Sequence, residues 1–317
     1  MLTQLSKIKL LLYLLLICFY AITNISCSGD KKSIEDIEFK KHYDLGSKYY
    51  KERKYQEAIK EFEQAANINP KIADSYFKIG RSYNRLLKYE ESIKSYEKGL
   101  QINPDAPFRV FFYLGSNNFK LQKYDETINY IKKAQELMTE ENSNSEYSVN
   151  FLLANSYYYK KDYDNAIRHF NHVLDLKPDY ELAYFLLSES HIIKGNNAEA
   201  IQILEKGLKQ SPNSLYLLQS LSWLLSTSSS DQLRDGQRAV ILGERAVDFT
   251  EGKNHNCWDI LAAAYAEVAQ YDNALKSEEK AINVLTNSSI PATLNDSLLV
   301  EYKERLSSYK AKKPWRE

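Results

Sequence analysis

The sequence contains little glycine, proline or cysteine. Its 317 residues include 10 glycines, 7 prolines and 3 cysteines. So few glycines and prolines argue against disorder, collagen and a sheet-rich fold with many tight turns. The cysteines are Cys18, Cys27 and Cys257. If Cys18 is removed and Cys27 modified, as argued below, only Cys257 remains free, which excludes a disulfide framework and a multi-cysteine zinc site.

The chain also has no excess of charge of either sign. It carries 42 basic and 42 acidic residues. Removal of Lys7 and Lys9 with an export signal leaves two more acidic than basic side chains. A protein that holds a nucleic-acid backbone needs a basic field, so we expect no nucleic-acid partner.

Motifs that carry chemistry are missing as well. The sequence has no glycine-rich phosphate loop, no Gly-x-Ser-x-Gly elbow and no His-Glu-x-x-His pattern. His169 and His172 have the spacing of metal ligands but no third ligand at a fitting offset, and we interpret them as part of a solvated helix face. His255 and Cys257 lack an orienting third group. We therefore predict no enzyme activity, metal, cofactor or small-molecule substrate.

The longest apolar run is too short to span a bilayer. Leu10 to Ile22 is 13 residues long, against about 20 for a membrane-spanning helix. Lys7 and Lys9 precede the run, and a short polar stretch leads from it to Cys27. A basic end, a short apolar core and a small residue before the cut form the pattern of an export signal.

A cysteine directly after the cut resembles a bacterial lipoprotein signal. The resemblance implies removal of residues 1–26 and a diacylglycerol on Cys27, with 27–38 as a polar tether. The chain would then be anchored by lipid to a membrane of the bacterial cell envelope, with its folded part on the exported side. An uncleaved signal anchor and plain secretion are the alternatives.

Several residues recur after 34 positions. An internal period of this length indicates a repeat array. The pairs are Gly46 and Gly80, Pro70 and Pro104, Ala166 and Ala200, and Pro178 and Pro212.

This spacing resembles the tetratricopeptide repeat. The first repeat shows the pattern best, with Leu45, Gly46, Tyr49, Ala58, Phe62, Ala65 and Pro70. The resemblance implies an all-α fold, a right-handed superhelix of paired helices. The predicted repeats are 39–72, 73–106, 108–141, 147–180, 181–214, 215–254 and 255–286, followed by a capping helix and tail in 287–317.

Packing physics accounts for the small and the apolar positions. Gly46 and Ala58 are expected where the two helices of one repeat cross most closely. No repeat buries its apolar stripe alone, so the stack supplies the stability. The capping helix is expected to start near Asn295 or Ser297. Its core-facing residues at helical spacing are Leu298, Tyr302, Leu306 and Tyr309.

The last third of the chain resembles a subgroup of bacterial tetratricopeptide proteins. This resemblance bears on fold and origin but not on activity, and Asp235-Gly236 within it is interpreted as a turn and helix cap. The matching segments are 222–225, 233–236, 261–266 and 314–317.

The family resemblance also implies a concave groove lined by the first helix of each repeat. The aromatic residues at these positions either anchor a bound peptide or are ordinary family residues, and the sequence leaves both open. The candidate groove residues are Tyr43, Phe77, Arg81, Arg85, Arg109, Phe112, Phe119, Phe151, Asn155, Tyr158, Phe185, Ile192, Ile193 and Trp223.

Charge divides these positions into two groups. Repeats one to three are basic, and repeats four to seven carry Glu189, Asp259 and Glu267 without a base. We therefore predict a non-catalytic scaffold that binds a protein or peptide with acidic and apolar residues. The alternative is a targeting subunit that positions substrate for a separate envelope enzyme. In repeats one to three, the acidic residue at these positions is Asp74, and the basic residues are Lys40, Lys51, Arg81, Arg85, Arg109 and Lys120.

Overall fold

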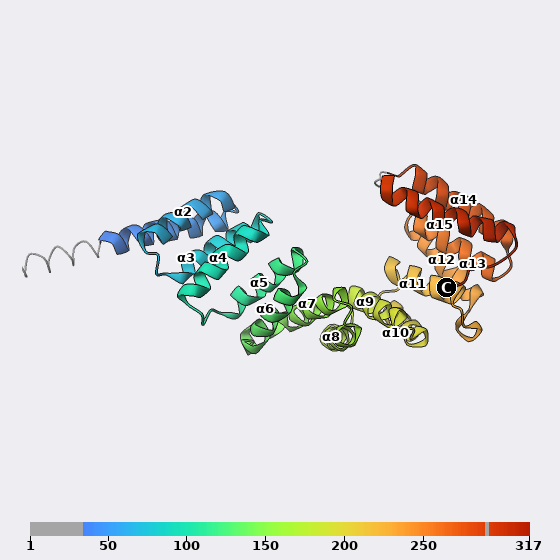
Figure 1. Cartoon of the computed structure of the whole chain (residues 1–317), viewed down its shortest axis with the longest axis horizontal. Helices are drawn as coiled ribbons and strands as arrows, with labels where there is room; N and C mark the ends of the chain where they lie inside the picture. The colour runs from blue at the N-terminus through green and yellow to red at the C-terminus, as the bar shows by residue number, and fades with distance from the viewer. Residues whose placement is uncertain (1–33, 289–291) are drawn as a thin grey trace, which may run out of the picture. The chain divides into compact units, whose positions relative to one another are not determined.

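Helices form all the regular structure that we describe. The computed structural model describes residues 34–288 and 292–317, and no strand occurs in these two ranges (Figure 1). The all-α prediction is confirmed. The predicted export signal and Cys27 lie outside the described residues. Within the described ranges, no helix combines the length and the hydrophobicity that a membrane crossing requires.

The chain consists of two compact units, divided between Met138 and Thr139. In the first unit, each helix packs against the next. Residues 34–51 are helical and precede α2, and the later helices follow as the pairs α3/α4 and α5/α6. The bounds are α2 Tyr55–Ile68, α3 Ala73–Arg85, α4 Tyr89–Ile102, α5 Phe108–Lys120 and α6 Tyr124–Glu136.

The second unit contains four helix pairs and a final helix. The pairs are α7/α8, α9/α10, α11/α12 and α13/α14, and α15 packs on α14 (Figure 1). The bounds are η1 Glu140–Ser145, α7 Glu146–Tyr159, α8 Tyr163–Leu176, α9 Glu181–Ile193, α10 Asn197–Gln210, α11 Leu215–Thr227, η2 Asp231–Leu233, α12 Gly236–Phe249, α13 His255–Glu267, α14 Tyr271–Thr286 and α15 Ala292–Lys310.

Most of the turns inside the helix pairs share one backbone geometry. One residue of the turn is left-handed, and the following N–H bonds to a carbonyl five residues further back, as from Lys88 to Tyr83 at 3.0 Å. This hydrogen bond satisfies a carbonyl that the end of the helix leaves unpaired. The left-handed residues are Arg53, Leu87, Gln122, Lys161, Gly195 and Ala269, with φ between 58° and 79°.

Small residues let the paired helices approach. A Cβ atom on Gly46 would lie 2.9 Å from the ring of Phe62, and one on Gly80 would lie 2.9 Å from the ring of Tyr96. The glycine therefore makes room for an aromatic ring of the second helix. Ala58, which we expected opposite Gly46, is fully buried, and at the equivalent positions of the next repeat the hydroxyl of Ser92 donates to the carbonyl of Gly80.

The capping helix is confirmed, but its start is not. Helix α15 begins at Ala292, so Ser297 lies inside it and does not cap it. Tyr302 and Tyr309 are buried against the preceding pair, as their spacing predicted.

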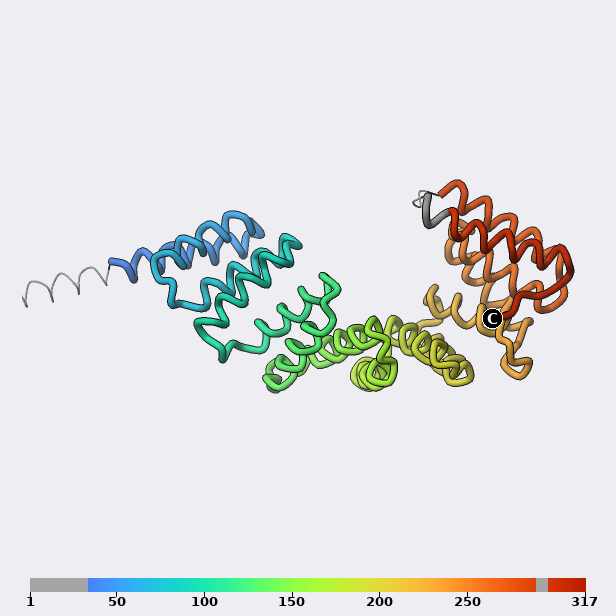
Figure 2. The backbone as a smooth tube through the Cα atoms, in the orientation of Figure 1, coloured from blue at the N-terminus to red at the C-terminus, as the bar shows by residue number. Residues whose placement is uncertain are grey.

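The segment after α15 runs back to the loop that follows α11 (Figure 2). The N–H of Glu317 donates to the carbonyl of Thr227, and the carbonyl of Glu317 accepts from the N–H of Ser229, both at 2.9 Å. This tail joins parts of the second unit that are far apart in the sequence.

Candidate functional site

The predicted groove residues lie on the first helices of their pairs, but they belong to two units. Half of them are in the first unit, on the helical residues 34–51, on α3 and on α5. The other half are in the second unit, on α7, α9 and α11. We describe the two surfaces separately.

In the first unit, two arginines meet one tyrosine. The guanidinium carbon of Arg81 lies 4.9 Å from the ring centre of Tyr50, and Arg85 Nε donates to Tyr50 Oη at 3.2 Å. Arg81 and Arg85 are four residues apart and therefore share one face of α3. Arg109 is exposed on α5 and makes none of these contacts.

Two hydrogen-bond donors in this group have no partner among the described residues. One is Nε of Arg81 itself and the other is the hydroxyl of the neighbouring Tyr96, and both atoms are out of contact with solvent. Burial raises the pKa of Tyr96, and the nearby Arg81 and Arg85 oppose this rise, so the phenol remains a donor. Tyr96 stacks on Tyr113 with 6.1 Å between ring centres. We call Tyr50, Arg81, Arg85, Tyr96 and Tyr113 the arginine cluster.

A polar network beneath the arginine cluster ties three helices together. Asn84 of α3 donates to Asn117 of α5, which donates to Ser92 of α4 at 2.8 Å. Ser92 in turn donates to the carbonyl of Gly80 at 2.6 Å. Ser92 occupies the position in the second repeat that Ala58 has in the first, 34 residues earlier. The serine at that position and the asparagine in the next repeat are the sequence features from which this hydrogen-bond network could have been predicted.

Two of the predicted groove residues are buried, so the prediction that they face a ligand is wrong. Phe77 is 8% exposed and packs on α4, where a Cβ on Gly99 would lie only 2.3 Å from the ring. Asn155 is 7% exposed, and its amide donates to the carbonyl of Phe151 at 2.7 Å.

The other aromatic candidates are half-buried against neighbouring rings. Tyr43 stacks on Phe39 and donates to Asp74, Phe112 stacks on Phe108, and Phe119 contacts Tyr124. In the second unit, Phe151 contacts Tyr180 and Tyr158 contacts Tyr163. These contacts hold each ring in place, and part of each ring remains accessible.

The second unit contains a pocket of about 690 Å³. Phe185, Ile192 and Trp223 line it, as the sequence led us to expect of groove residues, whereas Ile193 does not. Other walls come from α13, whose Asp259 the charge pattern placed in the groove, and from α15 and the tail, which the repeat pattern did not connect with it. They include Asp259, Glu301, Tyr302, Arg305 and Glu317. We call this cavity the acidic pocket.

Arg305 is the only basic residue among those that line the acidic pocket, and it is fully engaged. Its Nε donates to Asp259 at 2.7 Å, and an Nη lies 3.5 Å from Glu301. The guanidinium also lies 5.2–5.7 Å from the ring centres of Tyr302, Trp223 and Trp315.

Trp223 is partly covered by the chain itself. Its Nε1 donates to the carboxylate of Glu317 at 2.8 Å, and Arg305 lies over its ring. The two ends of the subgroup resemblance, residues 222–225 and 314–317, therefore meet in space.

The histidine and cysteine residues form no catalytic arrangement in the part of the chain described. His169 and His172 contact Asn150 and Glu146 of α7 at 2.9 and 3.0 Å, and the His172 side chain is 44% exposed, as a solvated helix face predicts. Cys257 is buried, and burial raises its thiol pKa. Residues 34–288 and 292–317 contain no group of three side chains able to hold a metal ion.

Asp235 caps α12, as predicted. Its carboxylate accepts from the N–H of Arg238 at 3.1 Å. The neighbouring Arg234 is not part of a binding surface, because it bonds to Glu267 and to the carbonyl of Ser228.

Comparison with known proteins identifies the repeats and the fold. Tetratricopeptide-repeat family models match residues 157–222 and 73–106, and a TPR repeat model matches 46–86. No curated protein sequence matches the chain.

Among solved structures, the C-terminal part of a TPR repeat-containing protein from Cytophaga hutchinsonii has a TM-score of 0.62 at 15% identity, over 78% of this chain and 96% of that one. YrrB, described as a TPR protein with an unusual peptide-binding site, has a TM-score of 0.52 at 20% identity, and the match covers 56% of this chain and 89% of YrrB. MamA has a TM-score of 0.51 at 20% identity, and the match covers 56% of this chain and 93% of MamA. At these identities the likeness concerns the fold. The family matches and the paired helices together make this chain a tetratricopeptide-repeat protein.

Proposed function

We propose that the chain is a scaffold that binds an acidic segment of a polypeptide partner through the arginine cluster of its first unit. The observation that carries this proposal is that Arg81 and Arg85 share one face of α3, with Arg85 exposed, and form no ion pair with any described residue. Donors and positive charge together select a carboxylate, which accepts hydrogen bonds from both. The peptide-binding site named for YrrB is consistent with this use of the fold.

Apolar residues of the partner have rings to contact beside the cluster. Phe112 and Phe119 are half-buried on α5, the helix that carries Tyr113. Aromatic contacts supply much of the energy of such interfaces, whereas exposed ion pairs contribute about 0–1 kcal/mol each. The arginines therefore set the rate and the choice of partner, and the rings set the lifetime of the complex.

The test uses a fluorescent peptide in which glutamates alternate with leucines and phenylalanines. Arg81→Glu with Arg85→Glu should weaken its binding about ten-fold or more and flatten the salt dependence of association. The matched control is Lys60→Glu with Lys94→Glu, which makes the same change of charge on exposed positions of α2 and α4. Equal binding by the two double variants would mean that only net charge matters and that the arginine cluster is not the site.

The scaffold is proposed to act at the bacterial cell envelope, held by a lipid on Cys27. The support is the sequence pattern before that residue: a basic end, an apolar run and a small residue. A labelled fatty acid should enter the wild-type protein in bacterial cells and not the Cys27→Ala variant. Equal labelling of both, or of neither, would remove the lipid anchor from the proposal.

A further inference from the structure

The acidic pocket of the second unit takes no part in the function proposed above, and its charge is opposite to that of the arginine cluster. Its lining residues include Glu189, Asp259, Glu301 and Glu317, with Arg305 as their one cation. Because Arg305 already pairs with Asp259 and Glu301 and lies over three rings, it is not free to neutralise the remaining carboxylates.

One wall of this pocket combines a free carboxylate with aromatic rings. Phe185 and Glu189 are four residues apart on α9 and therefore share one face. The ring of Phe185 packs on that of Tyr216 from α11, with 5.4 Å between centres. Glu189 makes no ion pair with any described residue, and burial raises the pKa of its carboxyl group.

The pocket wall carries four carboxyl groups and one cation. Beside the Glu189 carboxylate, Asn197 lines the pocket with an Oδ1 that has no hydrogen-bond partner among the described residues. Because acceptors and negative charge are in excess there, the wall favours a ligand that brings N–H donors and positive charge. The opposite wall shows how this unit accommodates such a group, because Arg305 is held there by aromatic rings and a carboxylate.

We infer that the acidic pocket binds an arginine side chain of a polypeptide partner, with the guanidinium on the rings of Phe185 and Tyr216 and paired with Glu189. A planar guanidinium stacks on aromatic faces and donates two parallel hydrogen bonds to one carboxylate. The volume of about 690 Å³ exceeds what a lone ion needs and leaves room for neighbouring residues of the partner. This site lies in the second unit and does not depend on the arginine cluster.

The experiment uses a short blocked peptide with a single arginine between apolar residues, and its twin with citrulline, a neutral isostere of arginine. Binding is followed by calorimetry and by tryptophan fluorescence. All three tryptophans, Trp223, Trp258 and Trp315, lie in the second unit, so the fluorescence reports on this unit alone. The arginine peptide should bind at least about ten-fold more tightly than the citrulline peptide. Equal affinity would overturn the inference.

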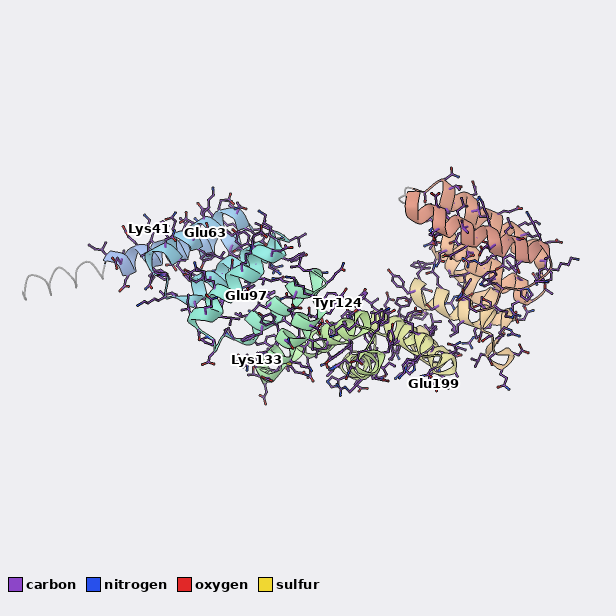
Figure 3. The ribbon with its side chains drawn as sticks, viewed as in Figure 1. Lys41, Glu63, Glu97, Tyr124, Lys133 and Glu199 are labelled. Atoms are coloured by element: carbon purple, nitrogen blue, oxygen red, sulfur yellow. The ribbon has the colours of Figure 1, made fainter. Side chains whose placement is uncertain are left out.

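The variant is Glu189→Gln, which keeps the size of the side chain and removes its charge. It should weaken binding of the arginine peptide about ten-fold and leave the melting temperature unchanged. The control is Glu199→Gln, on the exposed side of α10 in the same unit and labelled in Figure 3, which should bind as the wild type does. Wild-type affinity in Glu189→Gln contradicts the inference.

Two further measurements identify the occupant. Free arginine and spermidine should bind far more weakly than the peptide, and tight binding of either would make the pocket a small-cation site and overturn the assignment. The double variant Arg81→Glu with Arg85→Glu should bind the arginine peptide like the wild type. A failure of the acidic pocket is thereby distinguished from a failure of the arginine cluster.

Discussion

Arg305 of α15 and Asp259 of α13 form an ion pair at 2.7 Å inside the second unit, with side chains only 7% and 3% exposed. The pair connects the capping helix to the helix two before it. Glu278 of α14 is fully buried beside Asp259. Three ionisable residues, one from each of three helices, therefore share a single buried site.

Removal of Arg305 should destabilise the second unit strongly. Arg305→Met keeps most of the volume but leaves the carboxyl of Asp259 buried without its cation, which typically costs about 3–5 kcal/mol. Urea unfolding followed by tryptophan fluorescence measures this unit. Lys276→Ala, an exposed change on α14, serves as the control and should have little effect. A loss below about 1 kcal/mol for Arg305→Met would show that the ion pair is not a structural requirement.

Glu278 should make the second unit less stable as pH rises. Burial, then the nearby Asp259, raises the pKa of Glu278 above its ordinary 4.5, and burial also raises the pKa of Asp259. The folded state therefore retains a proton that the unfolded chain releases above pH 4.5, and stability falls from that pH upward. Glu278→Gln should flatten this dependence and be at least as stable as the wild type at pH 8.

The control for this effect is the neighbouring Glu279→Gln, an exposed position on the same helix. It should keep the pH dependence of the wild type in melts recorded between pH 5 and pH 9. If Glu278→Gln keeps the same slope as the control, Glu278 is not the titrating group.

Phe77 and Gly99 should be coupled energetically. Phe77→Ala should cost the first unit about 3–5 kcal/mol, because the ring is buried. Gly99→Ala should cost about 1–3 kcal/mol, because the new Cβ would meet that ring. In a double-mutant cycle, Phe77→Ala together with Gly99→Ala should cost less than the sum of the two single changes, because the ring that the new Cβ would meet is gone. Additive losses would show that the two residues do not contact each other.

Leu87 should be replaceable by glycine with a gain in stability. It is left-handed, with φ 59°, and its side chain is 70% exposed, so glycine removes backbone strain and loses little packing. We expect Leu87→Gly to stabilise the first unit by up to about 1 kcal/mol, measured by circular dichroism in denaturant. Leu86→Gly should destabilise it, because Leu86 packs on the core beside Tyr76 and Ile79. A loss of stability in Leu87→Gly contradicts the strain argument.

The sequence predicted the elements well because the repeat period sets helix length, turn position and the helix that bears each groove residue. It could not predict exposure at equivalent positions. Phe77 and Phe112 occupy the same place in their repeats, yet Phe77 is buried because Gly99 on α4 makes room for its ring. The period gives the residue pattern of a typical repeat, and it does not predict where a residue of the paired helix departs from that pattern.

The repeat pattern also could not predict contacts between segments that are far apart in the sequence. The repeat period says nothing about the pairing of Asp259 with Arg305, or of Trp223 with Glu317. These contacts depend on how α15 and the tail fold back, and both segments line the acidic pocket. The acidic character of repeats four to seven was visible in the sequence through Glu189 and Asp259, but the cavity was not.

The exposed acidic and basic side chains of the second helices lie on a part of the surface that belongs to neither proposed site. Glu63 on α2 and Glu97 on α4, both labelled in Figure 3, are exposed, and Tyr130 of α6 donates to Glu97 at 3.3 Å. Changes at such positions serve as neutral controls for both proposed sites.

The turns inside the helix pairs bear on how such a chain diverges. Arginine, leucine, glutamine, lysine, glycine and alanine all occupy the same left-handed position, held there by the backbone hydrogen bond that follows it. Since the geometry resides in the main chain, a duplicated pair of helices carries its turn with it whatever side chain stands there. Substitution at this position therefore changes stability by only about 1 kcal/mol of left-handed strain, and it can alter solubility or partner contacts while the repeat is preserved.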